Sequence, residues 1–409
     1  MTRPASLVSG NALPPRWSPA SIAGVTAGGR VPVLWICGPA GAGKSTVSWR
    51  LYEELARSGV RVAFADSDQL CMCYPAPAGD PGRQHIKALN VGAMIPNFSV
   101  AGAQCVIVNG VLGPAGLETS LLPCARVTIC RLRASPGDIE ERFIARHGPG
   151  AGTDELLREI RDEVRLMDGS SFADACVDTT GVPAGDVPGL VRAACQDWPG
   201  FTGRLEEQAG QPPARPAGPD RPAGGRVALI TGPAGVGKST IGFRFYLTCL
   251  SAGLTAGYAD LSQLGFTDPS LAGDPVNQRL KARNLAAIWR NYRAAGATHL
   301  VAAGTIASRA DLQLYTGELP GTGVALIRLR AGRSELRRRI MSRGAGGSWP
   351  EPGDRLAGQP AGFLTGIADQ AVQAAGALDR SDLGGVALDT TSWSPDESAS
   401  RLREALGWP

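Results

Sequence analysis

Lysine is scarce in this chain of 409 residues. Lysine and arginine together number 41, yet only four of them are lysine, so arginine supplies nearly all of the positive charge. The lysines form two pairs, Lys44 with Lys238 and Lys87 with Lys281, and the members of each pair are 194 positions apart. An arginine-rich sequence that keeps lysine only at repeated positions indicates sites where a compact ammonium group cannot be replaced by a planar guanidinium.

Other features are also missing from the sequence. No hydrophobic run approaches the length of a membrane span, and the first residues lack the continuous apolar segment of a secretion signal. The net charge is only +4, and no basic stripe with interleaved aromatic residues suggests nucleic acid. The nine cysteines lack a regular metal-ligand spacing and are typical of buried thiols in a reducing compartment. We therefore expect a cytoplasmic protein without membrane or nucleic-acid partners.

The repeated positions divide the chain into two similar units. Residues 1–30 are rich in Pro, Ser, Ala and Gly and are expected to form a flexible tail before a first unit at 31–202. A Pro/Gly-rich linker is expected at 203–225, and the second unit covers 226–409. In each unit, apolar strands alternate with helices, which predicts an α/β fold with a parallel sheet covered on both faces.

The strongest motif is a glycine-rich loop between the first strand and the first helix of each unit. It reads GPAGAGKST in the first unit and GPAGVGKST in the second, the pattern of a phosphate-binding P-loop. Backbone N–H groups would surround a phosphate, the lysine would contact the β- and γ-phosphates, and the serine would bind Mg²⁺. The main alternative is that one of the two copies is degenerate and non-catalytic. The predicted ATP-binding residues are Gly38, Gly41, Gly43, Lys44, Ser45 and Thr46, and Gly232, Gly235, Gly237, Lys238, Ser239 and Thr240, with Ser45 and Ser239 as metal ligands.

Carboxylates follow the second strand of both units. The first unit has Asp66 and Asp68, whereas the second has Asp260 and, at the position of Asp68, Ser262. The carboxyl edge of a parallel sheet is where ligands bind in such folds. A carboxylate there can orient Mg²⁺ or accept the proton of an acceptor hydroxyl. The alternative is that these aspartates cap the next helix.

The helix that follows carries a polar stripe on its core-facing side. At about 100° per residue, a lysine and two asparagines in each unit fall on one face, bracketed by apolar side chains. Polar groups on a buried face need partners. We expect this stripe to line a substrate pocket, with internal hydrogen bonding to neighbouring loops as the alternative. The residues are Lys87, Asn90 and Asn97 in the first unit and Lys281, Asn284 and Asn291 in the second.

A later helix in each unit has two arginines four residues apart. Arg142 and Arg146 correspond to Arg339 and Arg343, and a glycine-rich segment follows each helix. Four-residue spacing places both cations on one helical face, from which a closing lid could bring them to a transferring phosphoryl group. Arg146 and Arg343 are the predicted catalytic pair because they adjoin the glycines. A solvated basic face is the alternative.

These motifs resemble those of the P-loop small-molecule kinases, including gluconate, shikimate and adenylylsulfate kinases and chloramphenicol phosphotransferases. The resemblance covers nearly all of both units and implies a five-stranded parallel sheet in the order 2-3-1-4-5 in each. It also implies Mg²⁺·ATP as cofactor, a hydroxylated small molecule as substrate, and a role for Asp66, Asp68 and Asp260 at the acceptor or the metal. The sequence departs from the family where the third strand ends, because Asn109 or Ala303 stands in place of the usual acidic residue.

The sequence therefore predicts a phosphotransferase in which one or both units are active. Lys44 and Lys238 would stabilise the transferring charge, and the first unit would be the better equipped because its aspartate pair is intact. The alternative is a nucleotide-dependent switch or ATPase without an acceptor. A kinase of nucleic-acid ends is less favoured because a basic stripe is missing. The sequence indicates neither the acceptor nor the oligomeric state.

Overall fold

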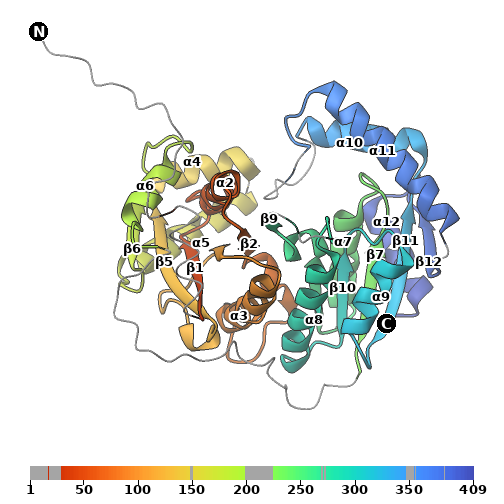
Figure 1. Ribbon diagram of the computed structural model, residues 1–409, viewed down its shortest axis with the longest axis horizontal. Coiled ribbons are helices and arrows are strands. Elements are labelled where there is room, and N and C mark those ends of the chain that lie inside the picture. Colours follow the sequence, from red (N-terminus) through yellow and green to blue (C-terminus); the bar gives the residue numbers. More distant parts are fainter. Residues whose placement is uncertain are drawn as a thin grey trace, which may run out of the picture.

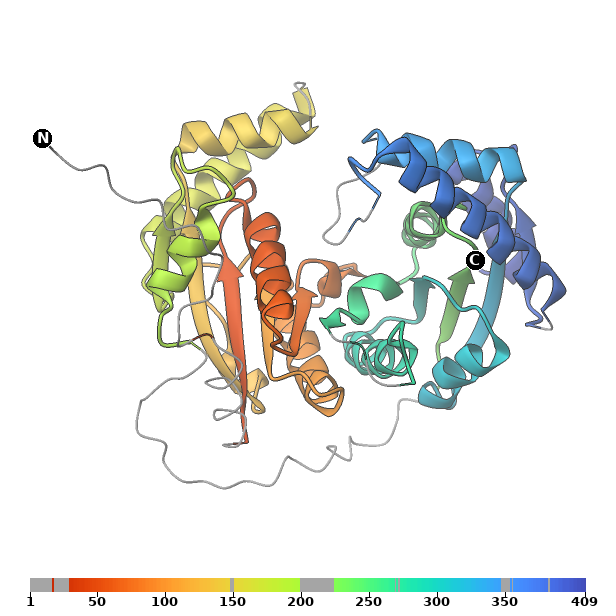
Figure 2. The same cartoon turned by 45° about the horizontal axis from the view of Figure 1, so that its top comes forward.

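The computed structural model describes residues 29–147, 151–198, 224–268, 273–346, 356–381 and 383–409, together with Trp17, Ser270 and Asp354. They form two α/β units that lie beside each other in Figure 1 and Figure 2. Among the described residues no helix has the length and apolar character of a membrane span. The predicted linker and tail lie almost wholly outside these residues. Trp17 is an exception to the expected flexible tail, because it is fully buried and packs against Trp198 at 4.9 Å between ring centroids.

The first unit begins with β1 and ends with α6. Its strands are β1 (Val31–Cys37), β2 (Val62–Asp66), β3 (Cys73–Tyr74), β4 (Cys105–Asn109), β5 (Ala125–Arg133) and β6 (Ala175–Asp178). Its α-helices are α2 (Lys44–Arg57), α3 (Gln84–Val100), α4 (Pro136–His147), α5 (Ala151–Asp168) and α6 (Val187–Ala194). Two short 3₁₀ turns, η2 (Gln69–Cys71) and η3 (Thr119–Leu121), follow β2 and β4.

The second unit repeats this order and adds helix α9. Its strands are β7 (Arg226–Thr231), β8 (Ala256–Asp260), β9 (Thr267–Asp268), β10 (His299–Ala303), β11 (Gly323–Arg330) and β12 (Val386–Asp389). Its helices are α7 (Lys238–Ser251), the 3₁₀ turn η4 (Leu261–Leu264), α8 (Gln278–Ala294), α9 (Arg309–Glu318), α10 (Arg333–Gly344), α11 (Ala361–Arg380) and α12 (Pro395–Leu406).

Each sheet has six strands, not the predicted five. The orders are β6-β5-β1-β4-β2-β9 and β12-β11-β7-β10-β8-β3. The strands from β6 to β2, and from β12 to β8, pair in parallel, as apolar strands separated by helices do. The added edge strand is antiparallel in both sheets and comes from the other unit. The predicted strand order is therefore wrong at this edge.

The two edge strands are exchanged reciprocally. Strand β9 of the second unit pairs with β2, where Val62 lies opposite Asp268, and β3 of the first unit pairs with β8, where Ala256 lies opposite Tyr74. Phe64 N donates to Phe266 O at 3.0 Å, and Tyr258 N donates to Met72 O at 2.8 Å. Each unit thus covers an edge that would otherwise expose unpaired backbone groups.

The apolar core is continuous between the units. Helices α3 and α8 lie side by side in both views, and their buried side chains, such as Phe98 and Tyr292, belong to one hydrophobic cluster. Each sheet also has a separate cluster on its other face, under α2 in the first unit and α7 in the second. Phe266 reaches across from the second unit, and its ring centroid lies 5.1 Å from that of Trp49. The units are therefore joined by packing as well as by the chain.

Candidate functional site

The two glycine-rich loops lie at the carboxyl ends of β1 and β7, where α2 and α7 begin. Gly43 and Gly237 precede the helices with φ of 88° and 98°, a left-handed conformation that favours glycine. Lys44 Nζ donates to Pro39 O at 3.0 Å, and Lys238 Nζ donates to Gly232 O and Pro233 O at 3.1 and 3.0 Å. Helix N-termini with this backbone suit an anion such as phosphate. The predicted loop residues Gly38, Gly41, Ser45, Thr46, Gly232, Gly235, Ser239 and Thr240 lie in or directly after these turns.

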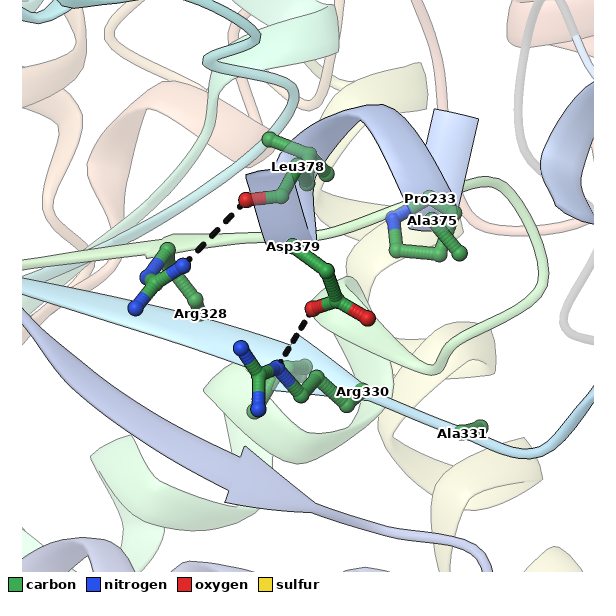
Figure 3. Close-up of a pocket in the computed structure, with 8 residues that line it drawn as sticks. Pro233, Arg328, Arg330, Ala331, Ala375, Leu378 and Asp379 are labelled. Atoms are coloured by element: carbon green, nitrogen blue, oxygen red, sulfur yellow. Dashed lines mark hydrogen bonds and ion pairs between the residues drawn. The ribbon is translucent and has the colours of Figure 1, made fainter. Parts of the chain in front are cut away.

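A small pocket lies beside the second loop. It is lined by Pro233 and by residues of β11 and α11 (Figure 3). Arg328 donates to Leu378 O at 3.3 Å, and Arg330 pairs with Asp379 at 2.6 Å, so both arginines hold β11 to the end of α11. The cavity volume of about 30 Å³ suits a water molecule and is too small for a nucleotide. We assign no ligand to it.

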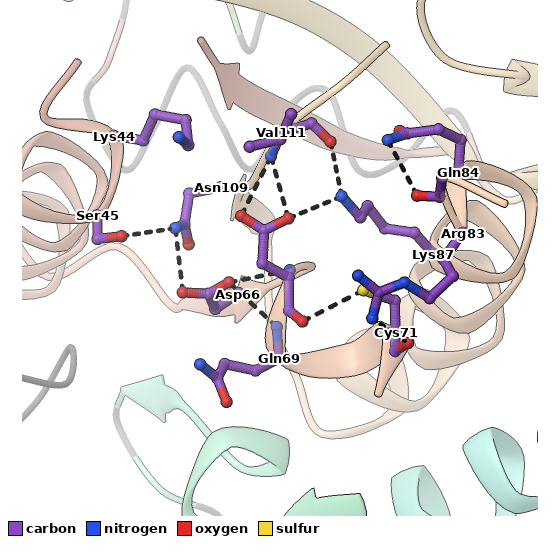
Figure 4. Close-up of polar contacts among 12 residues, drawn as sticks. Lys44, Ser45, Asp66, Gln69, Cys71, Arg83, Gln84, Lys87, Asn109 and Val111 are labelled. Atoms are coloured by element: carbon purple, nitrogen blue, oxygen red, sulfur yellow. Dashed lines mark hydrogen bonds and ion pairs between the residues drawn. The ribbon is translucent and has the colours of Figure 1, made fainter. Parts of the chain in front are cut away.

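In the first unit, one amide connects the loop serine to the buried carboxylate. Asn109 ends β4, and its Nδ2 donates to Ser45 Oγ at 3.1 Å and to Asp66 Oδ2 at 3.2 Å (Figure 4). The other oxygen of Asp66 accepts the backbone N–H of Asp68 at 3.0 Å and of Gln69 at 3.4 Å. The aspartate therefore caps the following turn, as the alternative interpretation held, and also adjoins the phosphate loop.

The two aspartates of the first unit have different electrostatic environments. Burial and the nearby charge of Asp68 raise the pKa of Asp66 to about 6. Asp68 instead accepts from Lys87 Nζ at 2.7 Å and from Val111 N at 3.1 Å. Burial tends to raise the pKa of Asp68, but the charges of Lys87 and Lys44 outweigh this effect and lower the pKa. Near neutral pH, Asp68 stays ionised in an ion pair, whereas Asp66 can take up or release a proton.

A third carboxylate of the first unit lies at its phosphate loop. Glu163 of α5 is half-buried, and α5 packs against Ala40 of the loop through its apolar side chains. Burial raises the pKa of Glu163, although the charge of Lys44 opposes the shift. Glu163 therefore adds a carboxylate near the first phosphate loop.

In the second unit, the loop serine and the carboxylate are in direct contact. Ser239 Oγ donates to Asp260 Oδ2 at 2.5 Å, and the other oxygen accepts the Ser262 hydroxyl at 2.7 Å and its N–H at 2.8 Å. Ala303, which corresponds to Asn109, has no side chain to bridge them. Burial lowers the pKa of Lys238 to about 8, although Asp260 opposes the shift and Arg343 adds to it. Arg343 is therefore close enough to this loop to act on its lysine.

The predicted lid arginines have carboxylate or backbone partners. Arg343 pairs with Asp354 at 2.9 Å. Arg339 donates to Val236 O at 2.8 Å and to Thr390 O at 2.7 Å, and Arg142 similarly donates to Thr179 O at 3.0 Å. Arg142 and Arg339 therefore hold the last strand to the lid helix. Arg146 lies in α4, but its side chain falls outside the described residues.

The asparagine stripe lies between the two units. Asn97 Nδ2 donates to Asn284 Oδ1 at 2.9 Å, and Asn291 Nδ2 donates to Asn90 Oδ1 at 2.8 Å. Asn90 and Asn284 also donate to Leu70 O and Leu264 O, at 2.6 and 2.7 Å. These amides hydrogen-bond to each other and to neighbouring turns, which is the internal bonding that the alternative interpretation expects. We therefore do not assign the asparagines to an acceptor pocket. Lys87 and Lys281 lie in the first turns of α3 and α8, and neither takes part in these amide contacts.

The loop serines and adjacent groups fit a bound Mg²⁺. Hydroxyl and carboxylate oxygens are the ligands that Mg²⁺ prefers, and it usually takes only one or two protein ligands when phosphates supply others. The second unit offers Ser239 and Asp260 in contact. In the first unit, Asn109 Oδ1 is buried without a partner, so the amide could turn this oxygen toward Ser45. Among the described residues no group of three or more His, Cys, Asp or Glu could hold a metal alone.

Two functional contacts were not predicted from the sequence. Asn109 was noted only for replacing an acid, yet its place at the end of an apolar strand signals a side chain at the ligand-binding edge. Glu163 gives no such signal, because it is one of several acidic residues on an amphipathic helix. Only the packing of α5 over the loop distinguishes Glu163 from the other acidic residues of this helix.

No protein-family model matches the chain, and no curated protein matches its sequence. Among solved structures, the Mycobacterium tuberculosis APS kinase CysC is similar at 16% identity and a TM-score of 0.30, covering 46% of this chain and 99% of that one. A gluconokinase from Sinorhizobium meliloti matches at 18% identity and a TM-score of 0.29, covering 45% and 96%. The Deinococcus radiodurans tunicamycin resistance protein matches at 16% and 0.30, covering 45% and 97%. Each match covers less than half of this chain, and at these TM-scores the likeness carries no argument about activity.

Proposed function

We propose that the chain is an ATP-dependent phosphotransferase that moves the γ-phosphate to a hydroxyl group of a small molecule. The observation that carries this proposal is the link between phosphate loop and carboxylate in both units. Asp66 reaches Ser45 through Asn109, and Asp260 contacts Ser239 directly. A phosphate held by either loop would thus have a buried carboxylate beside it. That is the arrangement that transfer to a hydroxyl requires.

The residues of the first unit divide the chemistry between them. The acceptor oxygen attacks the γ-phosphorus, the bond to the bridging oxygen breaks, and ADP leaves. Asp66 takes the acceptor proton, a role that suits a carboxylate whose pKa is raised to about 6. Lys44 balances the charge that develops on the phosphates. Asp68, held by Lys87 at 2.7 Å, would hydrogen-bond another hydroxyl of the acceptor.

The second unit has the same groups in a more direct arrangement. Asp260 would take the acceptor proton, Lys238 would contact the phosphates, and Arg343 would approach the γ-phosphate when the lid helix closes. Ser45 and Ser239 would hold Mg²⁺, which supplies charge neutralisation between the β- and γ-phosphates when bound. The intact aspartate pair makes the first unit the better-equipped catalyst. ATP, Mg²⁺ and a hydroxylated acceptor are thus the proposed ligands.

The test is ADP release with Mg²⁺·ATP over a panel of hydroxylated compounds: sugars, sugar acids, nucleosides and hydroxylated antibiotics. Lys44→Ala and Lys238→Ala are matched controls, because each removes the same group from one unit only. We expect acceptor-stimulated release to fall by about 10²-fold or more in the variant of the working unit. Loss of different acceptors in the two variants would show that both units are active.

The same experiment addresses the alternative of a nucleotide-dependent switch. In that case the chain would bind ATP through both loops, and no compound would stimulate ADP release. The asparagine stripe does not separate the two functions, because its amides join the units. The discriminating groups are now Asp66, Asp68 and Lys87 in the first unit and Asp260 and Lys281 in the second.

A further inference from the structure

Lys87 and Lys281 occupy the same position in two equivalent helices. Asp80 and Asp274 cap α3 and α8 by accepting N–H groups of the first turn, at 3.0 and 2.7 Å for the shorter contacts. The residues before the helices, Arg83 and Asn277, have φ of 55° and 56°. The backbone therefore presents both lysines in the same way, and any difference between them comes from the side chains around them.

In the first unit, the lysine charge is neutralised within the protein. Lys87 Nζ lies 2.7 Å from Asp68 Oδ1 and donates to Val111 O, also at 2.7 Å. The side chain is only 4% exposed. A charge-assisted pair of this kind leaves the ammonium little capacity for an anionic ligand.

In the second unit, both partners of the lysine are lost. Ser262 replaces Asp68, and its hydroxyl donates to Asp260. Thr305 O, the counterpart of Val111 O, accepts instead from Gln278 Nε2 at 2.7 Å, and Tyr315 fixes that glutamine by donating to its oxygen at 2.7 Å. Among the described residues, the side chain of Lys281 makes no hydrogen bond or ion pair, and only its backbone N–H donates, to Asn277 O at 2.9 Å.

The carboxylates around Lys281 are occupied elsewhere. The Asp274 carboxylate caps α8, the Asp311 carboxylate accepts Ser308 N in the capping box of α9, and Asp260 binds Ser239 and Ser262. All three act on Lys281 only through space, and burial outweighs them and lowers the pKa of the lysine. The Lys281 side chain packs against Gly265, directly after the turn that Asp260 caps, so it lies on the same turn as the carboxylate beside the phosphate loop. Lys281 is half-buried, so its ammonium is partly removed from water without a side-chain partner among the described residues, and an anionic ligand could supply one.

We propose that the second unit takes an acceptor with an anionic group, a carboxylate, sulfate or phosphate, held by Lys281, whereas the first unit takes an acceptor without one. The first unit presents two carboxylates and one neutralised lysine, which suits an uncharged or cationic compound. The second presents one carboxylate and one ammonium whose side chain has no partner in the part of the chain that the structure describes. This division rests on the proposed function, because it assumes that both pockets receive acceptors. It makes the two units enzymes for compounds of different charge.

Acetylation of the lysines tests the proposal directly, because the whole chain has only four. The intact protein is treated with an acetylating reagent under saturating Mg²⁺·ADP, which protects Lys44 and Lys238, and labelling is followed by peptide mass spectrometry. We expect Lys281 to react at least about tenfold faster than Lys87, because an ion pair to a carboxylate holds Lys87. Equal rates would overturn the proposal.

Protection by matched compounds identifies the ligand class. Gluconate and glucitol differ by one carboxylate, and glucose 6-phosphate and glucose differ by one phosphate. We expect an anionic member to slow the acetylation of Lys281 by about tenfold and its neutral partner to have no effect. The more protective anion distinguishes carboxylate from phosphate. Equal protection by both members of each pair, or by none, would contradict an anion site.

Reciprocal variants serve as controls. Ser262→Asp supplies the carboxylate of the first unit and should abolish protection of Lys281, whereas Asp68→Ser should make Lys87 reactive and protectable by the same anion. Because these readouts need no turnover, they separate the two proposals. Anion protection without acceptor-stimulated ADP release would sink the phosphotransferase and keep the anion site. If both units released ADP only with neutral acceptors, the phosphotransferase would stand and the anion site at Lys281 would be contradicted.

Discussion

Asp66 is buried at the end of an apolar strand, yet it carries the carboxylate that the proposed reaction needs. Its pKa is raised from 3.8 to about 6 by burial and by Asp68. Between these pH values the folded chain holds a proton that the unfolded chain has released. The free energy of unfolding contributed by this group therefore falls as pH rises through that window, and the cost persists above pH 6. A charged Asp66, which the proposed reaction uses, therefore lowers the free energy of unfolding.

Asp66→Asn should show both effects at once. The amide oxygen can still accept the two backbone N–H groups, and Asn109 can turn its unpartnered Oδ1 to the new NH₂ group. We expect the free energy of unfolding at pH 7.5 to rise by roughly 1–3 kcal/mol, with less gain at pH 4, while first-unit activity is lost. Urea titrations at both pH values measure the change.

Asp68→Asn is the matched control for this variant. The lowered pKa of Asp68 means that its ionised form stabilises the folded chain above its usual titration range. Its replacement leaves the buried Lys87 with the Val111 carbonyl but without a compensating negative charge, and should lower the free energy of unfolding. If Asp66→Asn lowered the free energy of unfolding as much as Asp68→Asn does, the Asp66 carboxylate would not be destabilising in the folded chain.

At the scale of elements, the exchanged strands join side chains of one unit to the core of the other. Phe266 belongs to the second unit by sequence, but its ring packs on Trp49 and Phe64, with centroids 5.1 and 5.7 Å away. Met72 makes the reciprocal packing against the cluster under α7. The edge strand of each sheet is therefore anchored by an apolar residue next to it.

Phe266→Ala should destabilise the first unit although the residue lies in the second. Phe266 is half-buried, so we expect a loss of roughly 2–3 kcal/mol, below the range for a fully buried phenylalanine. Amide hydrogen exchange in β2 should accelerate more than exchange in β8. Phe363→Ala, at a side chain that is 46% exposed, is the control and should change neither. Faster exchange confined to the second unit would contradict the exchanged arrangement.

The sequence predicts the long strands and helices, but it does not predict the short strands at the edges of the two sheets. Apolar runs and the 194-residue repeat locate the parallel strands and the phosphate loops, because both features are local. Strands β3 and β9 have only two residues each, too few for a periodic pattern, and their partners lie in the other unit. Likewise, the asparagine stripe was correctly expected on the core-facing side of its helix, but the helical period does not say that the core is shared with another helix.

At the scale of the whole molecule, the two units behave as the halves of a dimer in one chain. The exchanged strands, the shared cluster of α3 and α8, and the paired asparagines all relate the halves by the same reciprocal contacts. An interface in which each partner contributes the same patch is the isologous type seen in twofold dimers. The connection along the chain is therefore not what holds the units together.

A protease site introduced into the predicted linker, 203–225, tests this view. After cleavage, we expect the two fragments to co-elute in size-exclusion chromatography at the position of the uncut chain. They should separate only in denaturant, because buried apolar surface and β pairing stabilise the contact. Cleaved Phe266→Ala should separate at a lower urea concentration than the cleaved parent. Fragments that elute apart in buffer would show that the linker maintains the arrangement.

The reciprocal edges also affect the order in which the chain is made. Strand β2 emerges from the ribosome long before its cover, since Thr267–Asp268 follows Trp198 by about 70 residues. At roughly 5–20 residues per second, the first unit waits about 4–14 s with this edge unpaired. During that time another nascent first unit on the same message presents the same edge and the same free β3. Faithful maturation therefore depends on each chain finding its own second half before it finds a neighbour.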